Sequence, residues 1–577
     1  MKLIGLSLSV LLAGWVAVAQ AQDDAVSPEG ATGRTGAKGG RAKSYMVVAA
    51  NPIAAQVGAQ ILKSGGSAVD AAIAVQLVLN EVEPQSSGIG GGAFMIHWDK
   101  KAQALTTFDG RETAPAAATE KRFLEDNKPM GHMTAVVGGL SVGVPGVLRM
   151  LEMAHKKHGK LPWAKLFDPA IRIAEEGFEI SPRLYGLLSG DQALRKIEPA
   201  KSYFYLPDGT AKPVGTRLKN PEFAKTLRAI AKGGADAFYR GPIADDIVRT
   251  VTAAPIHPGD ITRADIENYR AIERPAVCGP YRGYKICGMG PPTDGGIGII
   301  QAMGMLERFD LAHLGPQSAT AYHLVLEANR LVFADRAVYL ADPEVVPVPT
   351  EGLISRAYID QRSGLISAER SLGDVQAGTL PIRKAMNLVP APSPELPSTS
   401  HFSIVDHNGN AVGMTTSVEN SFGSRLMVDG FLLDNTLTDF SYGDVARGET
   451  VANRVGPNKR PRSSMAPTMV FGANGKLEMV LGSPGGPAIV PFVVKTLVAM
   501  IDWKMSPADA AALPYAVSFG RAVSIEPPIS SMKPALEALG HQVRIGEFPS
   551  GMHAIRITRD AILGGADPRR EGVAVGQ

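Results

Sequence analysis

The most constraining feature of the sequence is an abrupt change of character near residue 398. Residues 380–397 are polar and contain five prolines, a composition typical of a linker or an exposed loop. Directly after them, residues 399–406 and 411–418 alternate between apolar and polar side chains around the turn His407-Asn408-Gly409-Asn410. This pattern predicts a β-hairpin. Further strands are expected at 427–433, 469–471 and 476–481, so the last third of the chain is expected to be rich in β-sheet.

The first part of the chain carries strong helix signals. Apolar residues fall on one helical face over 52–63, and Gly65-Gly66 ends that segment. Ser67 then begins a second helix, with Asp70 three residues on in a variant of the capping box. Because residues 69–82 are apolar nearly all round, this second helix is expected to be buried. Helices are also predicted over 145–158 and 321–340, and a strand over 93–98.

Composition excludes several classes of protein. The 577 residues are 45% hydrophobic and carry a net charge of +3, which excludes wholesale disorder and disfavours nucleic acid as a partner. The two cysteines exclude an iron–sulfur cluster and a four-cysteine zinc site, and none of the 11 histidines stands in an HExxH motif. We therefore expect neither a metal ion nor a cofactor.

The N-terminus has the pattern of a secretory signal. Met1-Lys2 precedes an apolar run over 3–18 and the cleavage signal Ala19-Gln20-Ala21, so removal of residues 1–21 is expected. A membrane anchor is disfavoured because the polar pair Asp23-Asp24 follows at once. Residues 22–44 have almost nothing to bury and are expected to be a disordered lead-in. The mature protein is expected to be soluble and either periplasmic or secreted.

The two cysteines are placed to face each other. A two-residue hairpin centred on Arg282-Gly283 would bring Cys278 and Cys287 opposite each other at a non-hydrogen-bonded pair, where Cα atoms lie about 4.5 Å apart. That spacing is within reach of a disulfide, and an exported protein meets an oxidising compartment. We predict a structural disulfide, with two buried free thiols as the open alternative.

Two glycine motifs suggest other chemistry, but neither has the required context. Residues 88–93 fit the loose dinucleotide-binding pattern, yet a helix precedes them and a strand follows, which is the inverse of the required order. Residues 139–143 match the G-x-S-x-G nucleophile elbow around Ser141, but the next helix begins too late, near Pro145. For residues 88–93 the favoured interpretation is a tight loop that lines a pocket. For residues 139–143 it is a strand that packs in the core. A serine hydrolase acting through Ser141 stays open.

Thr399 is a third candidate nucleophile, at the junction between the linker and the first strand of the hairpin. A threonine hydroxyl needs an adjacent base, and the α-amine of an N-terminal threonine can serve as that base. An α-amine pKa of about 7.7–8.0 suits this task near neutral pH. Cleavage between Ser398 and Thr399 would create such a terminus.

The surroundings of Thr399 carry a family resemblance. The segment from Pro397 to Asp406 resembles the self-cleavage region of the γ-glutamyltranspeptidases. Similar segments follow the family's order along almost the whole chain: 65–72, 83–92, 111–115, 143–146, 238–241, 334–336, 456–461, 463–468 and 482–486. Several motifs in one order are far more specific than any one of them.

The resemblance implies an N-terminal-nucleophile hydrolase fold of the α+β class, an αββα sandwich of two stacked antiparallel sheets. One precursor would cut itself into a large subunit, residues 45–398 with the lead-in, and a small catalytic subunit, residues 399–577. These subunits would stay together as a heterodimer. The enzyme would transfer the γ-glutamyl group of glutathione and related compounds to water or to an amino acid or peptide, through an acyl-enzyme on Thr399.

The resemblance also implies roles for residues of the site. Gly485 and Gly486 match the family's oxyanion hole, and Arg111 matches its clamp for the substrate α-carboxylate. Ser463 and Ser464 match the hydroxyl partners of that carboxylate, and Asp439 matches the group that binds the α-ammonium.

The chain departs from the family pattern at three positions. Ser417 stands where a second threonine is frequent, Glu419 replaces an amide residue, and Thr436 replaces a Gln or Glu. We expect Glu419 to supply the ammonium ligand that Thr436 is too short to provide. Residues 442–455 are shorter than the lid loop of many members, which favours hydrolysis over transfer. Two alternatives stay open: a glutaryl or cephalosporin acylase of the same fold, and an exported solute-binding protein.

Overall fold

The computed structural model describes residues 38–391, 398–442, 448–518 and 522–577. The predicted signal peptide, residues 1–21, lies outside these ranges. Of the lead-in expected to be disordered over 22–44, the described part does not follow the prediction, because Lys38–Ala42 form an edge strand, β1. This strand pairs along its whole length with β22, so backbone hydrogen bonds rather than side-chain burial order it.

Two seven-stranded sheets form the centre of the molecule, and all neighbouring strands in both are antiparallel. The first has the order β1-β22-β21-β17-β16-β11-β10 and the second β23-β2-β12-β13-β3-β4-β9. The strands of the first sheet are β1, β10 (Val277–Tyr281), β11 (Tyr284–Gly288), β16 (Thr468–Phe471), β17 (Leu477–Gly482), β21 (His553–Ile557) and β22 (Ile562–Ala566). The strands of the second are β2 (Met46–Ala49), β3 (Gly92–Asp99), β4 (Ala104–Gly110), β9 (Ile272–Arg274), β12 (Ser398–Val405), β13 (Ala411–Glu419) and β23 (Val573–Gly576).

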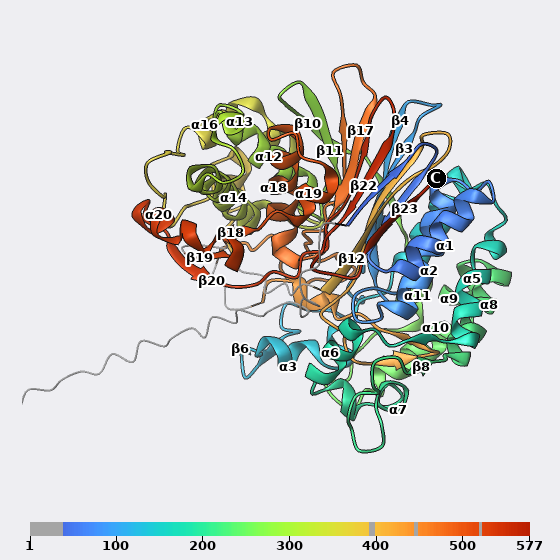
Figure 1. The fold of residues 1–577 in the computed structure, drawn as a ribbon. Helices are drawn as coiled ribbons and strands as arrows, with labels where there is room; N and C mark the ends of the chain where they lie inside the picture. The colour runs from blue at the N-terminus through green and yellow to red at the C-terminus, as the bar shows by residue number, and fades with distance from the viewer. Residues whose placement is uncertain (1–37, 392–397, 443–447, 519–521) are drawn as a thin grey trace, which may run out of the picture.

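The two sheets stack face to face and helices cover their outer faces (Figure 1). Met46 and Val48 of β2 pack between the sheets with Val480 of β17, whereas Val47 packs outward against the helices. This alternation is the period of two that a strand imposes. Helices α1 (Pro52–Lys63) and α2 (Ala68–Val82) cover the second sheet. Helices α12 (Gly295–Leu306), α14 (Ala319–Tyr339) and α18 (Ile489–Ile501) cover the first. The predicted αββα sandwich is thereby confirmed.

A lobe of further helices extends from the second sheet (Figure 1). Its helices are α4 (Val147–His158), α5 (Asp168–Glu176), α6 (Pro182–Gly190), α7 (Ala200–Phe204), α8 (Pro221–Gly233), α9 (Asp236–Tyr239), α10 (Pro242–Thr252) and α11 (Arg263–Asn268). Their apolar side chains join the same core as α1 and α2.

Local sequence signals explain the helices that carry the core. The Ser67 side chain accepts from the Asp70 N–H and the Asp70 carboxylate accepts from the Ser67 N–H, so the predicted capping box is formed at the start of α2. Every residue of α2 is buried, as its apolar pattern predicts. The predicted strand at 427–433 is instead two short strands, β14 (Met427–Val428) and β15 (Phe431–Leu432), because Asp429 and Gly430 turn the chain at positive φ.

Two other features bear on the predictions. The described part of the linker contains a short helix, α17 (Pro381–Ala385), which begins with proline at its first position. The β10–β11 register places Cys278 opposite Cys287, and their sulfurs are bonded in a disulfide with a Cα–Cα distance of 4.1 Å. Across the described ranges, no helix combines the length and the apolar character needed to cross a membrane.

Candidate active site

The junction between linker and hairpin lies at the start of β12, in the middle of the second sheet. Thr399 pairs with Ser417 of β13, and its Oγ1 lies 3.2 Å from the Ser417 Oγ. The Ser417 hydroxyl also donates to the carbonyl oxygen of Ser398 at 2.7 Å. One hydroxyl therefore contacts both the candidate nucleophile and the carbonyl next to it.

An irregularity in the ladder sets this geometry. The register of β12 against β13 shifts between Ser398 and Thr399, as at a β-bulge, and bulges re-aim side chains beside active sites. Glu419 ends β13 with a positive φ of 76°, and its N–H donates to the Ser417 Oγ at 2.9 Å. The Ser417 hydroxyl is thus oriented from both sides.

A small pocket opens beside Thr399. Its volume is about 20 Å³, which is close to the space of one water molecule. Eight of the predicted site residues line it, together with two that the sequence analysis did not select. The lining residues are Arg111, Thr399, Ser417, Glu419, Asp439, Ser463, Ser464, Met465, Gly486 and Ile489.

Arg111 and Asp439, predicted to bind opposite charges of one substrate, bind each other in this structure. Arg111 Nη2 donates a hydrogen bond to an Asp439 carboxylate oxygen, and the two groups form an ion pair. Both side chains are buried. Arg111 Nη2 also donates to the carbonyl of Arg462 at 2.9 Å, and its Nε donates to the carbonyl of Pro461 at 3.3 Å. These carbonyls come from the segment directly before Ser463, so they hold the guanidinium against the two serines.

Thr436 does not line the pocket, and its position shows why. Its hydroxyl donates to the Glu112 carboxylate at 2.7 Å, behind Arg111. Asp434 accepts from the N–H of Thr436 at 2.8 Å and from that of Gly143 at 3.0 Å. Burial, reinforced by the negative charge of Glu112, raises the pKa of Asp434 well above its usual range. Thr436 therefore contacts Glu112, the neighbour of Arg111, rather than the pocket itself.

Glu112 and Asp434 belong to the site although no sequence pattern predicted a role for them. Glu112 directly follows Arg111 within the RETAP segment, and an ion pair of 3.6 Å joins the two side chains. Burial raises the pKa of Glu112, against the opposing effect of Arg111. The adjacency of Glu112 to the clamp was an available signal. Asp434 had none, because only the fold brings it to Gly143, 291 positions away in sequence.

Glu419 points into the pocket from the end of β13. One of its carboxylate oxygens accepts from the Asn435 side-chain N–H at 2.5 Å. Asn435 also donates to the Thr438 hydroxyl at 2.9 Å and accepts from the Asn420 N–H at 2.8 Å. Glu419 and Asp439 thus bring two carboxylates to a pocket that has one guanidinium.

Gly485 and Gly486 lie where the backbone turns into α18. Both have positive φ, 141° and 53°. A Cβ at Gly485 would lie 2.6 Å from the ring of Phe492, so glycine is required there. Gly486 lines the pocket, whereas Gly485 lies directly before it. Main-chain N–H groups at the start of a helix favour negative charge, which suits an oxyanion.

Comparison with known proteins agrees with this geometry. The model of the gamma-glutamyltranspeptidase family matches residues 54–577. The chain belongs to the γ-glutamyltranspeptidase family. It is 37% identical over 548 residues to the glutathione hydrolase proenzyme of Bacillus subtilis, covering 92% of each chain. It is 34% identical over 531 residues to the acylase ACY 1 proenzyme of a Pseudomonas species, covering 90% of this chain and 91% of the acylase.

A solved structure supports the fold assignment. The cephalosporin acylase of Bacillus halodurans aligns with a TM-score of 0.82 at 27% identity, covering 96% of this chain and 99% of that one. This alignment agrees with the αββα sandwich described above.

The structure gives no support to Ser141 as a nucleophile in this member of the γ-glutamyltranspeptidase family. Ser141 is fully buried, and its hydroxyl donates to the carbonyls of Val136 at 2.7 Å and Gly138 at 3.1 Å. The glycine loop at 88–92 also has a packing role. A Cβ at Gly91 would lie 2.1 Å from the Ser417 carbonyl oxygen, so the loop closes tightly against β13.

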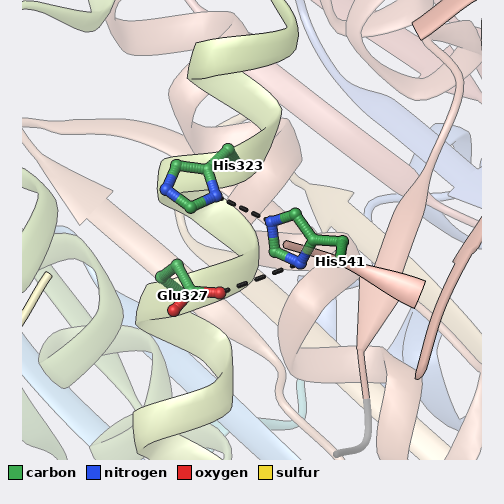
Figure 2. Close-up of side chains that lie close together, drawn as sticks. All are labelled: His323, Glu327 and His541. Carbon is green, nitrogen blue, oxygen red and sulfur yellow. Dashed lines mark hydrogen bonds and ion pairs between the residues drawn. The ribbon is translucent and has the colours of Figure 1, made fainter. Parts of the chain in front are cut away.

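One buried cluster contains metal-binding residue types. Figure 2 shows His323 and Glu327 of α14 facing His541, all three buried. Ring nitrogens of His323 and His541 lie 2.7 Å apart, and the second nitrogen of His323 lies 2.7 Å from the Ser367 carbonyl. Arg330 reaches the remaining nitrogen of His541 at 3.3 Å and the Glu327 carboxylate at 3.4 Å.

The hydrogen bonds of this cluster explain it without a metal. His323 can only donate to a carbonyl, so its other nitrogen accepts from His541, whose second nitrogen then accepts from Arg330. Two neutral imidazoles satisfy every step of this chain. A cation bound here would face the fixed positive charge of Arg330. The cluster joins α14 to β20 (Gln542–Ile545), the strand that begins directly after His541.

Proposed function

We propose that this protein is a self-cleaving γ-glutamyl hydrolase and transferase with Thr399 as its nucleophile. The observation that carries the proposal is the contact of Ser417 with both the Thr399 hydroxyl and the Ser398 carbonyl. That contact lies in a chain whose B. subtilis relative is a glutathione hydrolase proenzyme. The predicted N-terminal signal further suggests that the enzyme works in the periplasm or outside the cell.

Self-cleavage would begin when the Thr399 Oγ adds to the carbonyl carbon of Ser398. The Ser417 hydroxyl, 2.7 Å from that carbonyl oxygen, stabilises the developing negative charge. The bond from Ser398 to the Thr399 nitrogen breaks, the hydroxyl proton passes to that nitrogen, and an ester remains. Water hydrolyses the ester, which leaves a Ser398 carboxyl group and a Thr399 with a free α-amine and a free hydroxyl.

In the catalytic cycle the new α-amine takes the Thr399 hydroxyl proton as the oxygen attacks the substrate γ-carbonyl. The N–H groups of Gly485 and Gly486 stabilise the oxyanion, and the ammonium returns the proton to the leaving amine. Water or an acceptor amine then attacks the acyl-enzyme. The short segment 442–455, only part of which is described, leads us to favour water as the acceptor.

The Arg111–Asp439 ion pair gives the substrate pocket its selectivity. A γ-glutamyl α-carboxylate would bind Arg111, Ser463 and Ser464, and the α-ammonium would bind Asp439. The substrate thereby replaces one buried ion pair with two, and a ligand carrying only one of these charges leaves a buried charge unpaired. Glu419 offers the ammonium a second carboxylate beside Asp439.

The Arg111–Asp439 ion pair also distinguishes a γ-glutamyl enzyme from the main alternative, a glutaryl acylase. A glutaryl side chain has a carboxylate but no ammonium, so it would compete with Asp439 for Arg111 and bring no cation in return. The similarity to ACY 1 keeps an acylase as the second candidate. We expect γ-glutamyl-p-nitroanilide to be cleaved at least 100-fold faster than glutaryl-p-nitroanilide, in kcat/KM, because an uncompensated buried charge costs about 3 kcal/mol or more. Equal rates would favour the acylase.

The proposal as a whole is tested by processing. Purified wild-type protein should give two bands on a denaturing gel, the larger about twice the mass of the smaller, with the smaller band starting at Thr399. Thr399→Ala should give one band and no γ-glutamyl hydrolase activity. Ser141→Ala is the control and should process and react like the wild type. A single uncut band with full activity in the wild type would refute Thr399 as an N-terminal nucleophile.

A further inference from the structure

A buried arginine from the far C-terminal end of the chain reaches the main chain of the nucleophile. Arg570 lies in the turn between β22 and β23, 1% exposed, and its Nη1 donates to the carbonyl oxygen of Thr399 at 2.9 Å. Its Nε donates to the Pro549 carbonyl at 3.1 Å, and its own carbonyl accepts from Lys38 Nζ at 2.8 Å. The guanidinium is therefore fixed on both sides.

The charges around this contact come from several elements. The Glu83 carboxylate, after α2, accepts from the Ser400 hydroxyl at 2.7 Å and lies 3.6 Å from Arg183 of α6. Glu571 accepts from the Arg183 N–H at 3.3 Å. The pocket side contributes Glu419 and Asp439. His553 of β21 and Asp567 lie behind Arg570.

Arg570 also lies close to the atom that becomes the base after cleavage. The carbonyl oxygen and the nitrogen of Thr399 belong to one residue, so the standard backbone dimensions keep them within about 3.6 Å of each other. With the 2.9 Å hydrogen bond, the nearest guanidinium nitrogen lies within about 6.5 Å of the future α-amine. At such a distance in a buried site, two like charges repel strongly.

We propose that Arg570 is a positioning residue of the reaction, which fixes the Thr399 main chain and keeps the new α-amine in its uncharged, proton-accepting form. This inference rests on the proposed function of Thr399. Arg570 does not line the pocket beside Thr399, and its guanidinium reaches the Thr399 carbonyl oxygen instead.

Glu83 acts in the opposite direction, since a carboxylate favours a nearby ammonium. Burial raises the pKa of Glu83 to about 7, against the lowering effect of Arg570. Near neutral pH this carboxyl group is therefore only partly ionised and does not cancel the charge of Arg570. Burial lowers the pKa of His553 to about 3, so that ring is neutral and adds no charge.

The test is the acid limb of the pH profile of kcat/KM, which reports the free base of the mature enzyme. Arg570→Met removes the positive charge and should move this limb up by about one pH unit. Arg570→Lys keeps the charge and should leave the limb within a few tenths of a unit of the wild type. Glu83→Gln keeps an acceptor for Ser400 and removes the negative charge, so it should move the limb down.

Arg569→Met is the matched control. Arg569 is the neighbouring arginine, is equally buried, and bonds Glu526 and Asp567 rather than Thr399. Its loss should reduce the yield of folded protein without moving the limb. Where Arg570→Met does not mature, Glu83→Gln still tests whether the limb responds to the charges beside the Thr399 α-amine.

The inference is overturned if Arg570→Met or Glu83→Gln lowers kcat/KM at every pH with an unchanged limb. That outcome would leave Arg570 a purely structural residue. It is distinct from failure of the proposed function, in which the wild type itself would be uncut, or cut elsewhere than before Thr399.

Discussion

At the scale of single residues, the two carboxylates of the pocket give the sharpest expectation. Glu419→Ala removes a carboxylate that would bind the substrate ammonium, and a charge-assisted hydrogen bond is worth about 1.5–3 kcal/mol. We expect KM for γ-glutamyl-p-nitroanilide to rise about tenfold or more, with kcat changed little, because the interaction is made in the ground state as well. Glu419→Gln keeps the acceptor for Asn435, so it separates the effect of the lost charge on KM from the effect of lost packing. Steady-state kinetics would contradict the role if KM stayed constant in Glu419→Ala.

At the scale of elements, the start of α2 is the best place to measure what holds the scaffold. One Asp70 carboxylate oxygen accepts from the N–H groups of Ser67 at 2.8 Å, Lys160 at 3.0 Å and Leu161 at 3.1 Å. Ser67→Ala should cost about 1 kcal/mol of stability. Asp70→Ala removes the acceptor of one buried and two partly buried N–H groups and should cost about 2–3 kcal/mol. Denaturant unfolding of the uncut Thr399→Ala precursor measures both, and Asp70→Asn, which keeps an oxygen acceptor, should lie between them.

At the scale of the whole molecule, buried neutral histidines predict loss of stability in acid. Burial lowers the pKa of His97 and His553 to about 3 and that of His541 to about 4. Each is lower than the unfolded value near 6.5, so their stabilisation is present above pH 6.5 and is lost as the pH falls towards 3–4. Each histidine contributes at most about 3–5 kcal/mol. The unfolding free energy of the precursor between pH 4 and 8 should show this slope. His541→Gln should flatten the slope, whereas a change at the exposed His313 should not.

Local patterns predicted the parts of the fold that local forces decide. The hairpin at β12 and β13, the capping box of α2 and the Cys278–Cys287 register each depend on residues close in sequence. Contacts between residues far apart in sequence have no such local signal. Arg570 reaches Thr399 across 171 positions, and Thr436 meets Glu112 across 324. Family motifs selected most of the pocket lining, but no pattern along the chain indicates that Arg111 and Asp439 pair with each other.

The order of strands in the second sheet has a consequence for how the molecule can refold. β13 and all of β12 except Ser398 follow the proposed cut, and these two strands lie between β2 and β3, which precede it. Each product of the cut therefore has strands whose hydrogen-bond partners belong to the other. Before the cut, folding is a unimolecular event. Afterwards, regaining the native state after unfolding is an encounter between two chains and depends on their concentration. By the proposed function, the enzyme would be assembled once, and its activation would remove the covalent connection by which it was assembled.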